Sequence, residues 1–283
     1  MKIKVFCVGD VVGRPGRRIL AQQLSPFVKD HDVDCVIINA ENAAGGSGIT
    51  RQIYEKLFRY GAHLVTLGDH CYRKKEIIPI LESQPNIVRP ANLSVHAAGK
   101  DYAVYQTAKG ATVAIVTLIG RIFMKPADCP YAKIDNLLVK LKNEADIIFV
   151  EMHAEATSEK VAMGHYLDGK ASCVFGTHTH VMTADERILS GGTACITDIG
   201  MTGAHDSVLG RNSESVVRAF RTQMPYSFEV ATGDVRINGI LVTVDSHTRK
   251  AEHIERVVLY EEAQDDISAY DSDDGRPDYI NGF

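Results

Sequence analysis

The sequence predicts a layered α/β fold with mixed sheets, and three observations support this prediction. Short runs rich in Val and Ile recur along the chain, and each ends in small or polar residues. Amphipathic stretches with apolar residues three and four positions apart lie between these runs. Two stretches also have the pattern of β-hairpins. Near-continuous apolar runs are typical of strands covered on both faces, so we expect helices on both sides of the sheets.

The expected elements follow one another in a regular order. The expected strands lie within residues 2–10, 34–42, 63–70, 86–92, 111–120, 145–157, 171–180 and 193–200. The expected helices lie within residues 16–30, 51–61, 74–83 and 133–144. Residues 101–118 are expected to form a hairpin that turns at Lys109 and Gly110, and residues 233–260 an antiparallel pair with a late polar turn. The hairpins make the predicted sheets mixed, and the alternation of strands and helices places function at the carboxyl ends of the strands.

Composition sets limits on the class of protein. The chain has 283 residues, of which 45% are hydrophobic and 24% charged, so it is long enough for one large domain or two smaller ones. A net charge of −5 gives no reason to expect a nucleic-acid-binding surface. No apolar run approaches the length of a membrane span, and the start lacks the features of a signal peptide. The scattered cysteines are expected to be reduced thiols of a cytoplasmic protein.

The domain organisation is expected to be simple. Residues 1–260 are predicted to form a single domain, because no linker or internal repeat demands a boundary. Residues 261–283 are acidic and poor in apolar residues, so we predict a loosely ordered tail.

Polar residues stand where the predicted strands stop. Alternating residues on an extended segment point to the same side, so the two histidines of "VFGTHTH" can both face one point. Strand ends at one edge of a sheet lie close together, so the polar residues at these ends are expected to share one cleft: Asp10, Glu41, Asn42, Asp69, His70, His153, His178 and His180. Three carboxylates cannot remain ionised together without a counter-charge, which one or two metal cations would supply.

Each of these residues also has an ordinary structural explanation. Asp10 precedes a predicted helix and could cap it, and Glu41 and Asn42 could stabilise the glycine-rich loop that follows them. A single buried histidine such as His153 is more often a hydrogen-bonded core residue than a ligand. The prediction of a metal site therefore depends on the combination of residues.

Seven ordered motifs resemble those of the YmdB-like branch of the calcineurin-type metallophosphoesterases. They are "VGDVVGRPGR", "INAENAAGGSGIT", "TLGDH", "VEMHAEATSEK", "GTHTHV", "TDIGMTGAHDSVLG" and "FEVATGDVRINGILVTVD". The resemblance covers the chain from Met1 to about Leu259. It implies a four-layer α-β-β-α sandwich with mixed sheets around a dinuclear metal centre.

The resemblance also implies roles for the residues at the strand ends. One metal would be held by Asp10, Glu41, Asn42 and His180. The second would share Glu41 and also be held by Asp69, His153 and His178. A hydroxide shared by the two metals would attack the phosphorus atom, and His70 would be the proton donor. The mixed nitrogen and oxygen ligands favour iron or manganese, with zinc as an alternative.

One residue of the predicted centre departs from the family. The family usually has "GNH" where this chain has "GDH", so Asp69 adds a negative charge at a position where a neutral amide is expected. We expect this charge to tighten cation binding and to make the second metal less electrophilic.

These features predict a cytoplasmic metal-dependent phosphodiesterase. The resemblance implies that its substrates are small cyclic nucleotides, chiefly 2′,3′-cyclic phosphates, with 3′,5′-cyclic phosphates as a second class. The resemblance also suggests a homo-oligomer, for example a tetramer. From the composition we expect no membrane partner and find no strong indication of a nucleic acid partner. Two alternatives stay open. One is a phosphomonoesterase on the same centre, and the other is a regulatory or scaffold protein with a structural or degenerate metal site.

Overall fold

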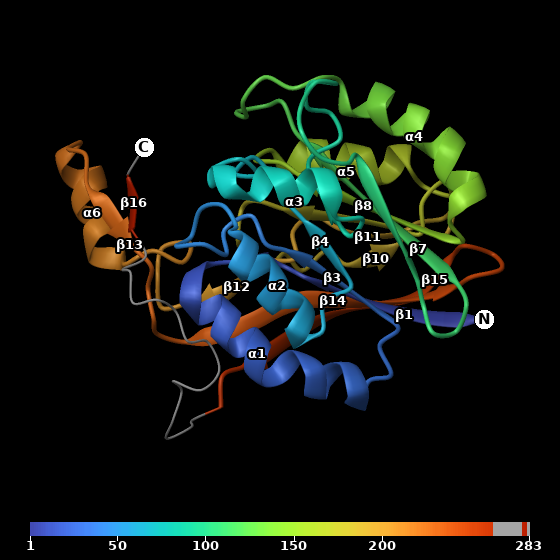
Figure 1. Ribbon diagram of the computed structural model, residues 1–283, viewed down its shortest axis with the longest axis horizontal. Helices are drawn as coiled ribbons and strands as arrows, with labels where there is room; N and C mark the ends of the chain where they lie inside the picture. Colours follow the sequence, from blue (N-terminus) through green and yellow to red (C-terminus); the bar gives the residue numbers. More distant parts are fainter. Residues whose placement is uncertain (263–278, 282–283) are drawn as a thin grey trace.

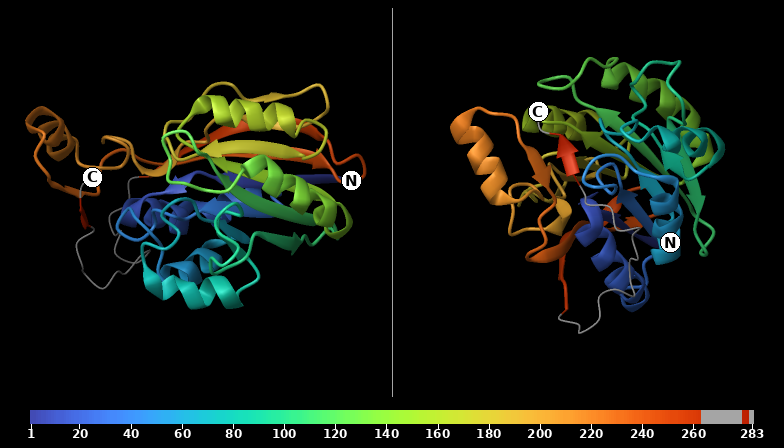
Figure 2. Two further views of the ribbon diagram at one scale, coloured as in Figure 1. Left: turned by 90° about the horizontal axis from the view of Figure 1, so that it is seen from above. Right: turned by 60° about the vertical axis from the view of Figure 1, so that its left-hand side comes forward.

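The computed structural model of the protein describes residues 1–262 and 279–281, and it has four layers (Figures 1 and 2). Two sheets pack face to face, and helices cover the outer face of each sheet. The predicted α-β-β-α sandwich with mixed sheets is therefore confirmed. The predicted acidic tail, residues 261–283, falls mostly on residues 263–278 and 282–283, which lie outside the described residues.

The first sheet has a parallel half and an antiparallel half. Strands β1, β3, β4 and β5 run parallel, whereas β14 is antiparallel to β1 and pairs with β15 on its other side. Its strand order is β2 (Asp10–Val11), β12 (Met201–Ala204), β14 (Val235–Asp245), β1 (Lys2–Val8), β3 (Cys35–Asn39), β4 (Leu64–Thr66) and β5 (Ile87–Val88), with β15 (Ala251–Tyr260) beside β14.

The second sheet is parallel at its centre. Strands β7, β8, β9 and β11 run parallel, and β6 and β7 form the predicted antiparallel hairpin. Its strand order is β10 (Arg187–Ile188), β11 (Ala194–Ile196), β9 (Cys173–Thr177), β8 (Ile147–His153), β7 (Thr112–Ile119) and β6 (Tyr102–Gln106).

The helices pack on the outer faces through apolar stripes. The first sheet is covered by α1 (Gly13–Asp30), α2 (Arg51–Tyr60) and α3 (Ile78–Ser83), which follows the short 3-10 helix η1 (Lys75–Ile77). The second sheet is covered by α4 (Pro130–Glu144) and α5 (Thr157–Tyr166). The sequence did not predict α5, because a buried lysine and a glycine interrupt its apolar spacing.

Strand β1 illustrates how the sandwich is held together. Its side chains alternate, so Ile3, Val5 and Cys7 join the core between the two sheets, while Phe6 and Val8 pack against the helices. Both faces of the strand are therefore buried, as its continuous apolar sequence predicts. The six cysteines are free, and five of them are buried. No helix in the described part of the chain combines the length and apolar character needed to cross a membrane.

A small lobe projects from one edge of the sandwich (Figure 1). It contains α6 (Ser213–Thr222), β13 (Ser227–Glu229) and β16 (Tyr279–Asn281), and β13 pairs with β16. Val216, Ala219 and Phe228 form a core of their own there, separate from those of the sandwich. The sequence did not predict this lobe.

Candidate metal centre

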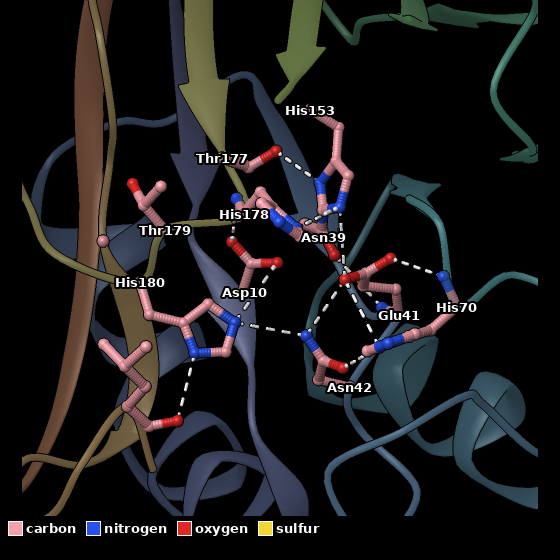
Figure 3. A network of polar contacts seen from close by, with 12 residues as sticks. Asp10, Asn39, Glu41, Asn42, His70, His153, Thr177, His178, Thr179 and His180 are labelled. Atoms are coloured by element: carbon pink, nitrogen blue, oxygen red, sulfur yellow. Dashed lines mark hydrogen bonds and ion pairs between the residues drawn. The ribbon is translucent and has the colours of Figure 1, made fainter. Parts of the chain in front are cut away.

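The polar residues predicted at the strand ends converge on one place. Figure 3 shows Asp10, Glu41, Asn42, His70, His153, His178 and His180 around a common centre, and Asp69 contacts this group through His153. The segments that follow the parallel strands β1, β3 and β4 deliver five residues from the first sheet, and β8 and β9 deliver His153, His178 and His180 from the second. The centre thus lies where the carboxyl ends of both sheets meet.

The backbone is specialised at this edge. A Cβ atom on Gly68 would overlap the Glu41 carboxylate and the His153 ring, so only glycine lets the chain pass there. His178 and His180 both have positive φ angles, of 91° and 62°, which non-glycine residues rarely adopt. Such strain is concentrated at functional sites.

Four of the residues form a tight group that can hold a metal ion. Their ligand atoms, one each from Glu41, Asp69, His153 and His178, all lie within 4.8 Å of one another. His153 Nε2 lies 3.2 Å from Asp69 Oδ1 and 3.4 Å from Glu41 Oε1. His178 Nδ1 lies 3.1 Å from His153 Nε2. A cation bound among these four residues could accept the lone pairs of their oxygen and nitrogen atoms, which otherwise face one another.

A second group adjoins the first through Glu41. Asn42 Nδ2 donates to Glu41 Oε1 and lies 3.3 Å from His180 Nε2. Asp10 is fully buried, and its Oδ1 has no hydrogen-bond partner among the described residues, although His180 Nε2 lies 3.8 Å away. A buried, unpartnered carboxylate oxygen is costly, so this atom fits a role as a metal ligand. Asp10 does not cap α1, whose N-cap residue is Val12.

The charges of the centre require compensation. Burial, and then repulsion from Asp198 and Glu151, raises the pKa of Asp10 well above its usual value. Burial, and then repulsion from Asp69 and Asp10, does the same to the pKa of Glu41. A bound cation would remove this penalty by favouring the ionised forms.

The histidines are suited to binding a cation. Burial lowers the pKa of His153 and of His180 to about 4, so both rings are neutral at pH 7 and have a free lone pair. Burial alone would raise the pKa of Asp69, but its contacts with His153 and the other imidazoles lower it below the usual value. The group therefore combines neutral nitrogens with an ionised carboxylate.

Removing metal should destabilise the protein, and increasingly so at higher pH. Because the folded-state pKa values of Asp10 and Glu41 are raised, the folded apoprotein holds these protons more tightly than the unfolded chain does. Its stability therefore falls as pH rises above about 4, the usual carboxyl value. At pH 8 we expect a chelator to lower the melting temperature by about 5–10 °C. This is the stabilisation that a metal present at about 100 times its Kd contributes to a chain of this size.

Differential scanning fluorimetry with and without chelator, from pH 5 to pH 8, measures this effect. The difference in melting temperature should widen as pH rises. A difference that is absent, or constant over this range, would contradict a metal-compensated carboxylate centre.

The sequence did not predict the hydrogen-bonded chain behind His153. Thr177 Oγ1 donates to Glu151 Oε1 at 2.7 Å, and Asn39 Nδ2 donates to the same oxygen at 2.6 Å. Because the Thr177 hydroxyl hydrogen is used in this way, Thr177 Oγ1 accepts from His153 Nδ1, 2.9 Å away. His153 Nε2 therefore carries no hydrogen, and its lone pair faces the centre. The only signal in the sequence was a charged residue, Glu151, inside an apolar strand.

Replacing Thr177 by valine should weaken metal binding. Valine has a similar shape but cannot accept the His153 Nδ1 proton, so the ring loses its fixed tautomer. We expect the affinity for the metal near His153 to fall about 10- to 100-fold. Metal titration of the apoprotein, followed by elemental analysis, measures the change, and Thr107→Val, at a buried threonine in the β6–β7 hairpin, is a matched control. Equal metal affinity in the Thr177→Val and control proteins would show that the chain has no orienting role.

A buried ion pair supports the loop that carries the two histidines. Lys160 Nζ lies 2.8 Å from Asp198 Oδ2, and both side chains are buried. Asp198 Oδ2 also accepts from the backbone N–H and the hydroxyl of Thr179, the residue between His178 and His180. The pair therefore connects α5 and the end of β11 to the centre of the site.

His70 stands at the edge of the centre. Its Nδ1 lies 2.7 Å from Asn42 Oδ1, and its backbone N–H donates to Glu41 Oε2 at 3.0 Å. Its side chain is 26% exposed, and its Nε2 lies 3.7 Å from Asp69 Oδ2. The ring is thus held beside the predicted ligands while remaining open to the solvent side.

The centre opens into a cavity of about 610 Å³. Arg73, Lys74 and Arg211 line it, so positive charge faces the cavity together with the imidazoles. The neighbouring thiol of Cys71 is buried and its pKa is raised to about 12, mainly by burial, so it is not a nucleophile at neutral pH. The cavity is therefore suited to an anionic ligand that reaches the candidate metal centre.

Comparisons with known proteins agree over most of the chain. The sequence model of a family described as "YmdB-like protein" matches residues 6–257. The chain is 44% identical over 257 residues to the 2′,3′-cyclic-nucleotide 2′-phosphodiesterase of Bacillus subtilis, covering 91% of this chain and 97% of that protein. It is 35% identical over 267 residues to a protein of Mycoplasma pneumoniae named "Putative phosphatase/phosphodiesterase", covering 92% and 94% of the two chains.

Solved structures show the same fold. A hypothetical protein from Thermus thermophilus is similar with a TM-score of 0.86 and 41% identity, covering 92% of this chain and all of that one. A phosphatase from Mycoplasma pneumoniae is similar with a TM-score of 0.86 and 34% identity, covering 93% of this chain and 95% of that one.

Proposed function

Because the chain belongs to the YmdB-like protein family, we propose that it is a metal-dependent phosphodiesterase that hydrolyses 2′,3′-cyclic nucleotides. The relative from Bacillus subtilis is named for this activity and matches this chain over nearly its whole length. A 3′,5′-cyclic nucleotide is a second candidate substrate for the same centre.

The unpartnered Oδ1 of buried Asp10, surrounded by carboxylates and neutral imidazoles, is the observation that carries the proposal. One ion would be held by Asp10, Glu41, Asn42 and His180, and the other by Glu41, Asp69, His153 and His178. When bound, the two ions would neutralise the phosphoryl oxygens and acidify a water molecule to make the nucleophile. Because an amide nitrogen cannot bind a cation, Asn42 would have to turn its Oδ1 toward His180.

His70 is proposed as the proton donor. Opening a cyclic phosphate releases an alkoxide, which needs a proton. Burial lowers the pKa of His70, and this makes its protonated form a stronger acid. Arg73, Lys74 and Arg211 line the cavity and would attract the negatively charged substrate.

A comparison of three substrates tests the activity. The proposal expects faster turnover of 2′,3′-cyclic AMP and bis-p-nitrophenyl phosphate than of p-nitrophenyl phosphate. Faster turnover of the monoester would favour the phosphomonoesterase, an alternative consistent with the name of the Mycoplasma pneumoniae relative. Bound metal without turnover of any of the three, after reconstitution with iron or manganese, would favour a regulatory or scaffold role.

Further parts of the proposal concern the metal and the assembly. We expect iron or manganese, because the ligands combine nitrogen with oxygen atoms, and elemental analysis of the purified protein would identify the metal. We also propose a homo-oligomer, which light scattering would measure. A cytoplasmic location is consistent with six free cysteines, five of them buried.

A further inference from the structure

The cavity over the candidate metal centre has two chemically different ends. One end is polar and contains Glu41, Asn42, His70 and the histidines of the β9 loop. The other end is formed by Val208 and Leu209, in the segment that leads into the projecting lobe, and by Val216, Phe220 and Phe228 of the lobe itself, which together we call the apolar wall. Figure 2 shows that this lobe stands apart from the sandwich. The apolar wall has no role in the chemistry proposed above.

The apolar wall is built on a fixed support. Val216 and Phe228 are buried in the small core of the lobe, where Val208 also packs. Phe220, one helical turn after Val216, lines the cavity and yet is 64% exposed. Phe220 thus places a largely exposed aromatic ring in the lining of the cavity, beside the core of the lobe.

Direct contacts connect the apolar wall to the metal centre. The backbone carbonyl oxygen of Leu209 lies 3.2 Å from His180 Nδ1. Arg211 donates from the same segment to the carbonyl oxygens of Gly45 and Gly46, in the loop after Asn42. The segment that leads into the lobe is therefore bonded to both sides of the centre.

We propose that the apolar wall is the subsite for the nucleobase of the substrate, and that Phe220 stacks against the base. This proposal rests on the proposed function. A cyclic nucleotide has an anionic phosphate at one end and a flat, largely apolar base at the other, which matches the two ends of the cavity. Stacking on an aromatic ring tolerates all bases, so the subsite would bind nucleotides in general.

Phe220→Ala in the full chain, assayed on two substrates, tests the subsite. One substrate is 2′,3′-cyclic AMP, and the other is methyl riboside 2′,3′-cyclic phosphate, which lacks a base. We expect the ratio of kcat/KM for the nucleotide over that for the base-free substrate to fall about tenfold, since stacking is lost for one substrate only. The loss should appear in KM, and Phe220→Tyr should restore the ratio.

Phe123→Ala serves as the matched control, because Phe123 is 88% exposed and does not line the cavity. An unchanged ratio in Phe220→Ala would overturn the subsite. If the kcat/KM ratio is unchanged but the oligomeric state of Phe220→Ala changes, the subsite is also overturned, and Phe220 belongs instead to a contact with a second copy of the chain.

Calorimetric binding of 3′-AMP and of ribose 3-phosphate separates this proposal from the proposed function, because it requires no turnover. If the wild-type protein binds 3′-AMP but hydrolyses no cyclic nucleotide, only the proposed function fails. If Phe220→Ala binds 3′-AMP as tightly as the wild type does, the subsite proposal fails whatever the activity.

Discussion

Replacing His70 by alanine should lower kcat by about 10²- to 10⁴-fold, the usual contribution of general acid catalysis. The metal content should stay the same, because His70 does not belong to the four-residue group around Asp69. The backbone N–H that His70 donates to Glu41 is also kept in the variant. Steady-state kinetics with 2′,3′-cyclic AMP, together with elemental analysis of the same preparation, measure both quantities.

His253→Ala is the control for this substitution. His253 is exposed on β15 and pairs with Thr243 of β14, near the end of the sheet opposite the metal centre. The two variants together test the proton donor assignment. An unchanged kcat in His70→Ala would refute it, and a loss of metal would instead mean that His70 is needed to assemble the centre.

Replacing Glu41 by glutamine should remove most of the bound metal and of the activity. Glu41 lies between the two groups of candidate ligands. Its Oε1 accepts from Asn42 Nδ2 and lies 3.4 Å from His153 Nε2, and its Oε2 accepts from the His70 backbone N–H. Removing a residue that only hydrogen-bonds to a metal ligand already weakens metal affinity about 10- to 100-fold. Removing the charge of Glu41 itself should therefore weaken metal affinity by more than about 100-fold. Metal titration and kinetics with 2′,3′-cyclic AMP measure the change.

A thermal measurement distinguishes this loss from misfolding. In chelator at pH 8, Glu41→Gln should melt at a higher temperature than the wild type, because a neutral amide replaces a carboxylate whose pKa is raised by burial. Glu155→Gln is the matched control, since Glu155 lies 3.2 Å from His178 but is 49% exposed. A Glu41→Gln protein that keeps its metal and activity would refute the central role of Glu41.

The strand ends were the part of the site that the sequence predicted well. Runs such as "DCVIINAEN" and "ASCVFGTHTH" are both a strand and its polar end, so a local pattern indicates where a side chain leaves the sheet. Parallel strands then bring such ends together. The roles of the individual residues remain predictions, because they depend on a bound metal.

The support of the site could not be predicted in this way. Glu151 and Lys160 each lie in an ordinary strand or helix, and their partners Thr177 and Asp198 are 26 and 38 residues away. Nothing local distinguishes a charged residue that is buried and paired from one that faces water. Each contact depends on how two elements pack.

The amino-acid sequence by itself determined the alternation of buried strands and amphipathic helices, and with it the edge at which the chemistry gathers. It could do so because burial of apolar side chains repeats with the period of each element. Only the tertiary structure decided which polar atoms lie within ligand distance, which carboxylate oxygen has no partner, and that a separate lobe with Phe220 borders the cavity. These depend on distances between residues far apart in the chain, which local periodicity does not encode.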